Sequence, residues 1–235
     1  WVCFAMCVGV MGTALASPLY PLYQAHWGLL PSHITGIYVA YMLGALASLL
    51  LLGRLSDRFG FLPVLRSGLM LVTVGVLLSA LAWNVLSFVV SRVLIGVASG
   101  MITTSASVGL TQLSRSSTVL HASAMTSFAM SLGFGSGPLL GGLLAQWLPH
   151  PLVSAYLPSL GLGALAVYAL FQVQVACAPA AAPLPLRAWL PRLTLPLPLL
   201  RRPFFIACFG AFCTFGIFGL YASLAPSFMG QMLPW

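Results

Sequence analysis

Long apolar runs, broken by short polar turns, fill almost the whole of this 235-residue sequence. Seven of the runs have about 20 residues, the length that an α-helix needs to cross about 30 Å of hydrocarbon. To within a few residues, the pattern predicts membrane-spanning segments over 2–22, 34–53, 63–83, 86–110, 121–146, 152–174 and 203–228.

Residues typical of turns separate the runs, as at Gly60 to Pro63 and at Pro149-His150-Pro151. In lipid every backbone polar group must be paired within the protein, so only helices or a closed β-barrel can span the membrane. The strict alternation over about ten residues that barrel strands require is absent. The sequence therefore predicts an all-α membrane protein.

Composition supports the same conclusion. Charged residues make up 4% of the chain and apolar residues 60%, and the mean hydropathy is +1.06, whereas a soluble domain has about 25% charged residues. A surface this poor in charge requires the lipid bilayer as its partner. The net charge of +8 would suggest nucleic acid in a soluble protein, but these arginines lie in short breaks between apolar runs, which excludes that partner.

The five cysteines have neither the spacing of a metal site nor that of a disulfide framework, and we interpret them as small apolar packing residues. We expect no cofactor and no bound metal. The sequence also has no Ser/His/Asp set, paired carboxylates or H-E-x-x-H motif within the spans, so an intramembrane hydrolase is disfavoured and we expect no enzyme.

The arginines predict the orientation in the membrane. Eight of the nine lie in the breaks that follow the second, fourth and sixth runs, and none lies in the breaks at 23–33, 84–85 and 147–151. Positive residues concentrate on the cytoplasmic side of membrane proteins. We expect a multi-pass protein of the plasma or inner membrane with its amino end in the cytoplasm.

The segment 175–202 differs from the rest because it contains six prolines, which exclude a continuous helix. It fits either a cytoplasmic linker lying against the headgroups or a disordered tether. In both cases it divides a six-helix unit, residues 1–174, from a further helix in 203–235. The chain begins and ends inside apolar stretches, so we expect both ends to be cut.

Three motifs carry chemical information. The first is Gly53-Arg54-Leu55-Ser56-Asp57-Arg58-Phe59-Gly60, between the second and third spans. Gly53 and Gly60 permit a tight reversal. Asp57 is the only acid in the chain and can meet a basic side chain or a helix N-terminus. An ordinary polar loop explains its position poorly.

The second motif places Arg92 in the fourth span, followed by Gly96 and Gly100 on one helix face. An arginine within the membrane is costly and is by default a candidate functional residue. The alternative is that Arg92, about two turns from the end of its span, extends to the interface. The two glycines permit a close contact with another helix.

The third motif lies in the fifth span and runs from Gly133 to Gly142. Glycine recurs every four residues along one face, and Pro138 removes a backbone hydrogen bond, so we expect a kink there. Its candidate residues are Gly133, Gly137, Pro138, Gly141 and Gly142. Glycine packing without any role in transport is the alternative.

Together the three motifs resemble those of the major facilitator superfamily: the G-x-L-a-D-R-x-G loop, the R-x-x-x-G-x-x-x-G helix, and the G-x-x-x-G-P-x-x-G-G signature found mainly in exporters and antiporters. The chain departs from the family pattern at Phe61 and Leu62, where two basic residues are usual, at Ile95, where a polar residue is frequent, and at Ala124, where an upstream glycine is expected.

The resemblance implies a six-helix bundle plus the first helix of a second bundle, as a fragment of a twelve-helix transporter. A missing carboxyl-terminal half of the same transporter would then be its partner. It also implies transport of a small-molecule substrate by alternating access, through a cavity lined on this side mainly by the first, second, fourth and fifth helices. The candidate lining residues are Thr13, Tyr38, Tyr41, Thr103, Thr104, Ser107 and Ser131. For any one of the seven, a hydroxyl bonded to its own helix is the simpler interpretation.

Proton coupling requires a titratable group exposed in turn to both sides. No span holds Asp, Glu or His in its middle, and Asp57 lies in a loop. The sequence therefore leaves three interpretations: an exporter or antiporter, an importer or uniporter of a metabolite, and a membrane sensor that transports nothing.

Overall fold

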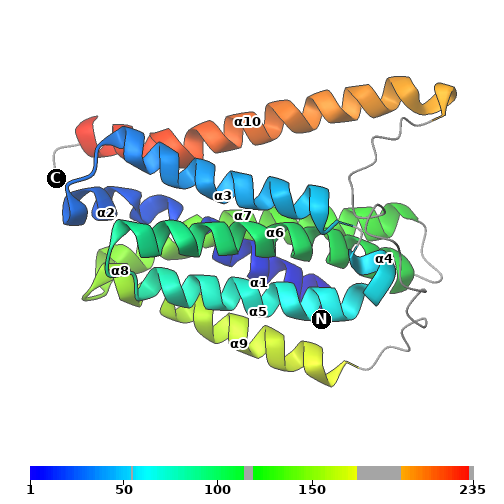
Figure 1. The fold of residues 1–235 in the computed structure, drawn as a ribbon, viewed down its shortest axis with the longest axis horizontal. Helices are drawn as coiled ribbons and strands as arrows, with labels where there is room; N and C mark the ends of the chain where they lie inside the picture. Colours follow the sequence, from blue (N-terminus) through cyan, green and yellow to red (C-terminus); the bar gives the residue numbers. More distant parts are fainter. Residues whose placement is uncertain (54, 114–118, 174–196, 233–235) are drawn as a thin grey trace.

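The computed structural model describes residues 1–53, 55–113, 119–173 and 197–232, and within them every regular element is a helix (Figure 1). The α-helices are α1 Val2–Ala14, α2 Tyr20–Trp27, α3 Pro31–Leu51, α4 Leu55–Phe59, α5 Phe61–Ala80, α6 Val85–Leu113, α7 Val119–Trp147, α8 Pro151–Ser154, α9 Leu157–Gln172 and α10 Arg201–Met232. Two 3-10 turns, η1 Ser17–Leu19 and η3 Pro198–Leu200, connect them in places.

All seven predicted spans are confirmed as helical segments long and apolar enough to cross a membrane. The first span runs to Trp27 rather than to 22. Pro18 and Pro21 do not end it, because each lies in the first turn of a new helix, where a missing N–H is tolerated. The first span is therefore α1, η1 and α2 in succession, and the sixth is α8 followed by α9.

Glycine shapes the turns at both ends of the bundle. Gly28 ends α2 with φ of 61°, and Gly60 precedes α5 with φ of 82°, a region that residues with a side chain rarely adopt. We call the end where residues 52–60 join α3 to α5 the loop end. The turn end holds the connections at 28–30, 81–84 and 148–150, beside the strongly exposed rings of Trp83 and Trp147. Exposed tryptophan is typical of the interface between membrane and water.

The closest helix packing in the bundle is glycine against backbone. Three α7 glycines cover successive carbonyl oxygens of the first span, each 2.5–2.6 Å from where a Cβ would stand: Gly133 on Cys7, Gly137 on Met11 and Gly141 on Leu15. The α3–α6 contact is built in the same way, with Gly96 against the carbonyl of Tyr41 and Gly44 against that of Val93. Small residues let helices approach this closely in membranes, where van der Waals contact drives association.

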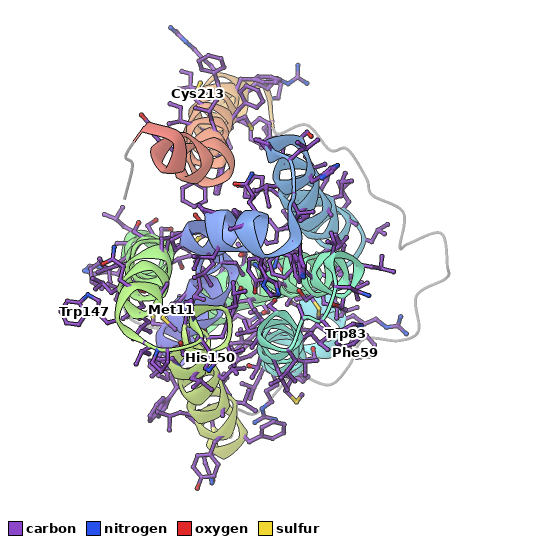
Figure 2. The ribbon with its side chains drawn as sticks, turned by 90° about the vertical axis from the view of Figure 1, so that its left-hand side faces the viewer. Met11, Phe59, Trp83, Trp147, His150 and Cys213 are labelled. Atoms are coloured by element: carbon purple, nitrogen blue, oxygen red, sulfur yellow. The ribbon has the colours of Figure 1, made fainter. Side chains whose placement is uncertain are left out.

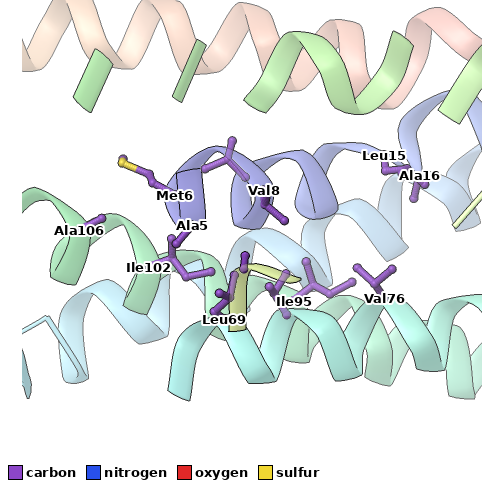
Figure 3. Close-up of a cluster of buried hydrophobic side chains, with 14 of the residues drawn as sticks. Ala5, Met6, Val8, Leu15, Ala16, Leu69, Val76, Ile95, Ile102 and Ala106 are labelled. Carbon is purple, nitrogen blue, oxygen red and sulfur yellow. The ribbon is translucent and has the colours of Figure 1, made fainter. Parts of the chain in front are cut away.

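Branched apolar side chains fill the space between the first span, α5 and α6 (Figure 3). Ile95 and Ile102 of α6 meet Leu69 and Val76 of α5 in this fully buried cluster. The dense layer fixes α6, and with it Arg92, in the middle of the bundle.

Helix α10 lies along the outside of this bundle beside α3 (Figure 1). Among its described side chains it touches the bundle through Phe218, whose ring centroid is 5.0 Å from that of Phe134 in α7. The proline-rich segment predicted at 175–202 falls mostly outside the described residues. Of the described part, Pro198–Leu200 form η3, and Arg201 and Arg202 open α10.

Candidate functional site

A small cavity lies where the first span, α3, α6, α7 and α10 meet. Its volume is about 20 Å³, room for about one water molecule. Hydroxyl groups, aromatic rings and one guanidinium line it: Thr13, Ser17, Tyr20, Tyr38, Tyr41, Arg92, Phe134 and Phe218. The residues that line this cavity are of the kinds found in binding pockets, but the cavity itself is too small for a ligand larger than water.

Arg92 is the charged group of this cavity and is only 1% exposed. Its Nη2 donates a hydrogen bond of 2.6 Å to Ser79 Oγ, and its Cζ lies 5.1 Å from the ring centroid of Phe88. Its Nε is buried without a hydrogen-bond partner among the described residues. The side chain points into the bundle and does not extend to the membrane surface, so the described geometry differs from the snorkelling alternative.

The contacts of Arg92 belong to a hydroxyl network that joins four helical segments. Ser79 Oγ of α5 lies 2.8 Å from Ser91 Oγ of α6. The hydroxyl of Tyr23, in α2, donates to the Ser79 carbonyl at 3.2 Å and lies 3.2 Å from the hydroxyl of Tyr156, just before α9. The network satisfies part of the guanidinium with neutral groups, and no described carboxylate contacts it. A buried cation without a counter-charge is costly by several kcal/mol, so this site attracts negative charge.

Tyr38 is the second polar side chain with an unused atom here. Its hydroxyl is buried, lines the cavity and has no hydrogen-bond partner in the described part of the chain. Its ring centroid lies 6.0 Å from that of Tyr41, on the same helix. Tyr38 and Arg92 both line this cavity, and each has one buried polar atom without a hydrogen-bond partner among the described residues.

The seven predicted lining residues divide into two groups. Thr13, Tyr38 and Tyr41 line this cavity, whereas the other four do not: Thr103, Thr104, Ser107 and Ser131. The hydroxyls of Thr13, Thr104 and Ser107 bond to carbonyls of their own helix at 2.7–2.9 Å, the simpler interpretation offered by the sequence. Thr103, Thr104 and Ser107 lie on α6, nearer the loop end than Arg92 does. Ser131 lies on α7.

The loop motif forms a short helix. Arg58 lies in α4 with its Cζ 5.1 Å from the ring centroid of Phe59, while Arg54 and the Asp57 side chain fall outside the described part. Phe61 and Leu62 stand where the family usually has basic residues. Both are buried, and Phe61 packs against Gly109 of α6. Apolar side chains here anchor the loop to the core.

The third motif lies on the α7 face against the first span, through Gly133, Gly137 and Gly141. A Cβ added at Gly142 would make only an ordinary contact with Pro18. Helix α7 continues through Pro138 without interruption. A kink at that proline stays a prediction.

Sequence reasoning missed Tyr20, Tyr23, Ser79, Ser91 and Tyr156. Four of them are hydroxyl residues within predicted spans, which was the available signal, whereas Tyr23 falls in the predicted break at 23–33. Tyr23 and Tyr156 are 133 positions apart in the chain. Only the packing of α2 against the start of α9 brings them together.

Comparison with protein families shows to which family this chain belongs. The family model of the Major Facilitator Superfamily matches residues 2–235. The chain belongs to that superfamily. The resemblance drawn from the three motifs is thereby confirmed, and with the seven helices it establishes a multi-pass membrane protein.

Curated relatives in this superfamily have diverse names. The riboflavin transporter RibZ of Clostridioides difficile is 23% identical over 171 residues, which are 71% of this chain and 37% of that protein. A triacylglyceride transporter of Mycobacteroides abscessus is 36% identical over 118 residues, 49% of this chain and 22% of that protein. MdtD of Yersinia enterocolitica, named for multidrug resistance, is 28% identical over 166 residues, 70% of this chain and 35% of that protein. The chain thus spans little more than a third of these relatives at most.

Proposed function

We propose that this chain forms part of a transporter that moves a small molecule across the membrane by alternating access, and that it works as an exporter or antiporter. The observation that supports this most directly is the cavity lined by Arg92 and Tyr38, two buried residues that each keep a polar atom without a hydrogen-bond partner among the described residues. Membership of the superfamily supplies the mechanism, and the glycine–proline motif of α7 favours export.

Coupling to protons would need an acid that this sequence does not place in any span. Asp57 is its only acid and belongs to α4. We therefore propose two alternatives: a proton carrier in a further half of the transporter, or transport that is not coupled to protons.

An importer of a metabolite is the second candidate. The match to a protein named as a riboflavin transporter, which covers 71% of this chain, supports a metabolite as the substrate; that name gives no direction of transport. The two candidates differ in direction and share the same cavity.

The deciding experiment expresses the complete gene product in cells that lack related transporters and measures accumulation of a panel of dyes, drugs and vitamins. Export predicts less accumulation of some compound than in empty-vector cells, with the difference abolished by Pro138→Leu. Uptake by the same protein would replace the exporter with the importer. Correctly folded protein that moves no compound would favour a sensor.

For the loop motif we propose a contact made in one conformation of the cycle, with Gly53, Asp57, Arg58 and Gly60 as its residues. Asp57→Asn should then lower transport severalfold while the protein still inserts in the membrane. Wild-type transport at equal expression would make Asp57 an ordinary loop residue.

We also propose that the loop end faces the cytoplasm, on the evidence of the arginines. Phe59 and Leu30 are both exposed and lie at opposite ends of the bundle. In a variant without native cysteines, Leu30→Cys should react with an impermeant thiol reagent in intact cells. Phe59→Cys should react only after the membrane is opened, and the reverse pattern would invert the orientation.

A further inference from the structure

A groove runs between α5 and α9, on the side of the bundle away from α10 (Figure 2). Its volume is about 550 Å³, and side chains of both helices line it: Met70, Thr73 and Val74 from α5, and Val167, Tyr168 and Phe171 from α9. The only polar groups among them are the hydroxyls of Thr73 and Tyr168, and that of Thr73 already donates to the Leu69 carbonyl at 2.8 Å. The groove belongs to neither the central cavity nor the hydroxyl network.

Hydrocarbon is the natural occupant of this groove. Val74, Tyr168 and Phe171 are all exposed in the structure, and α5 and α9 are both membrane spans. Water is excluded at this depth, so exposed apolar walls face lipid chains.

A cation lies beside the groove on the side of the loop end. Arg66 lies one helical turn before Met70, and its Cζ is 4.8 Å from the ring centroid of Phe171, which also lines the groove. The guanidinium holds the last turn of α9: Nε and Nη2 donate to the Leu170 carbonyl at 3.1 and 2.8 Å, and Nη2 also donates to the Val173 carbonyl at 2.8 Å.

The third nitrogen of the Arg66 guanidinium is Nη1. These bonds use Nε and Nη2, and none of the bonds that Arg66 makes to the described residues uses Nη1, which carries two further N–H groups. Arg66 is only half-buried. From Arg66 to Val74 the α5 axis rises about 12 Å, so cation and apolar walls lie within reach of one lipid molecule.

We propose that this groove binds an anionic phospholipid, with one acyl chain between α5 and α9 and the phosphate on Nη1 of Arg66. Charge complementarity selects the anionic class: guanidinium binds phosphate through parallel N–H groups, and the chain carries a net charge of +8 with no acid in either helix. A zwitterionic lipid brings a positive group to the same place and binds more weakly. Bound lipid then stabilises the last turn of α9.

The test uses the complete gene product, purified in a mild detergent, and measures bound lipid by native mass spectrometry and the melting temperature by intrinsic fluorescence. Dioleoyl phosphatidylglycerol should bind and raise the melting temperature, dioleoyl phosphatidylcholine should do both less, and inorganic phosphate should do neither. Arg66→Gln should weaken binding of phosphatidylglycerol about fivefold, the factor expected for one arginine near an anionic surface. It should leave phosphatidylcholine unchanged.

Two further variants make the result specific. Val167→Phe fills the groove, keeps Arg66, and should weaken both lipids. Arg202→Gln removes an exposed arginine of α10 and should change neither. If Arg66→Gln unfolds the protein, Arg66→Lys keeps the charge without the planar fork and should retain only part of the preference.

Three outcomes would overturn the proposal. Equal binding of the two lipids by the wild type would remove the charge selection. Stabilisation by inorganic phosphate equal to that by phosphatidylglycerol would make Arg66 a site for a soluble anion. Unchanged lipid binding in Val167→Phe would place the lipid elsewhere.

Discussion

The first span and α10 are almost equally apolar, yet the fold treats them in opposite ways. Their mean hydropathies are 1.8 and 1.9, but 72% of the most apolar stretch of the first span is buried and none of that of α10. Hydropathy measures how well a helix dissolves in lipid. It does not say whether another helix will replace that lipid.

The first span and α10 differ in the surface that each of them packs against. The first span presents successive carbonyls to glycines of α7, and its own Gly9 and Gly12 meet Ile102 and Val76. Helix α10 also contains glycines, but a Cβ added at Gly210 or Gly216 would meet no described atom within 4 Å, and one added at Gly219 would make an ordinary contact with the Tyr38 side chain. Small residues therefore permit close packing of two helices but do not cause it. Close packing also requires a backbone of the neighbouring helix that fits against them.

The largest effect is expected where glycine meets backbone. Gly137→Val would push a side chain into the Met11 carbonyl, which cannot move aside as a side chain would. Overpacking typically costs about 1–3 kcal/mol, and we expect at least the upper end here, together with loss of transport. Gly135→Val is the matched control, because Gly135 faces open space on the same helix. Equal melting temperatures for the two variants would contradict the packing.

The second largest effect is expected at Arg92, whose positive charge is buried beside the first span. Arg92→Lys keeps the positive charge but has a single nitrogen, so no second nitrogen is left to bind a ligand while the first holds Ser79. We expect insertion in the membrane to be unchanged and transport to fall about tenfold or more, the loss of one charged hydrogen bond. Transport rates at equal expression measure this. Full activity of the lysine variant would mean that only the charge matters.

A smaller effect is expected at Tyr38, which lies between the first span and α10. Its hydroxyl is buried without a partner among the described residues, so Tyr38→Phe should leave the melting temperature the same or slightly higher, by up to about 1 kcal/mol of stability. A change in apparent affinity for a transported compound, with stability retained, is the expected sign of contact with substrate. If the affinity also stays the same, the hydroxyl has no part in binding.

The smallest effect is expected in α10, the exposed helix of the two. Gly216→Val in α10 adds a side chain where nothing lies within 4 Å, and exposed changes of this kind usually alter stability by less than about 0.5 kcal/mol. Insertion and melting temperature of the complete gene product should match the wild type. A loss as large as that of Gly137→Val would reveal a close partner for this face of α10.

The sequence by itself determined the fold class, the seven spans and the family, because each depends on local features: runs of apolar residues and motifs within one loop or one helix. It also selected Arg92, Tyr38 and the α7 glycines, since charge, aromatic hydroxyl and glycine are rare or regular enough to be noticed along one helix. It did not determine where the first span ends, because a proline at 21 can stop a helix or begin one.

Only the tertiary structure decided which partner each of these residues meets. Tyr23 and Tyr156 share a hydrogen bond across 133 positions, and Arg66 holds carbonyls more than 100 positions away. The direction of the Arg92 side chain, into the bundle rather than toward the interface, follows from the register of α6 against α5 and the first span. That register is set by interlocking side chains and glycine contacts between distant segments, which no periodicity within a single helix encodes.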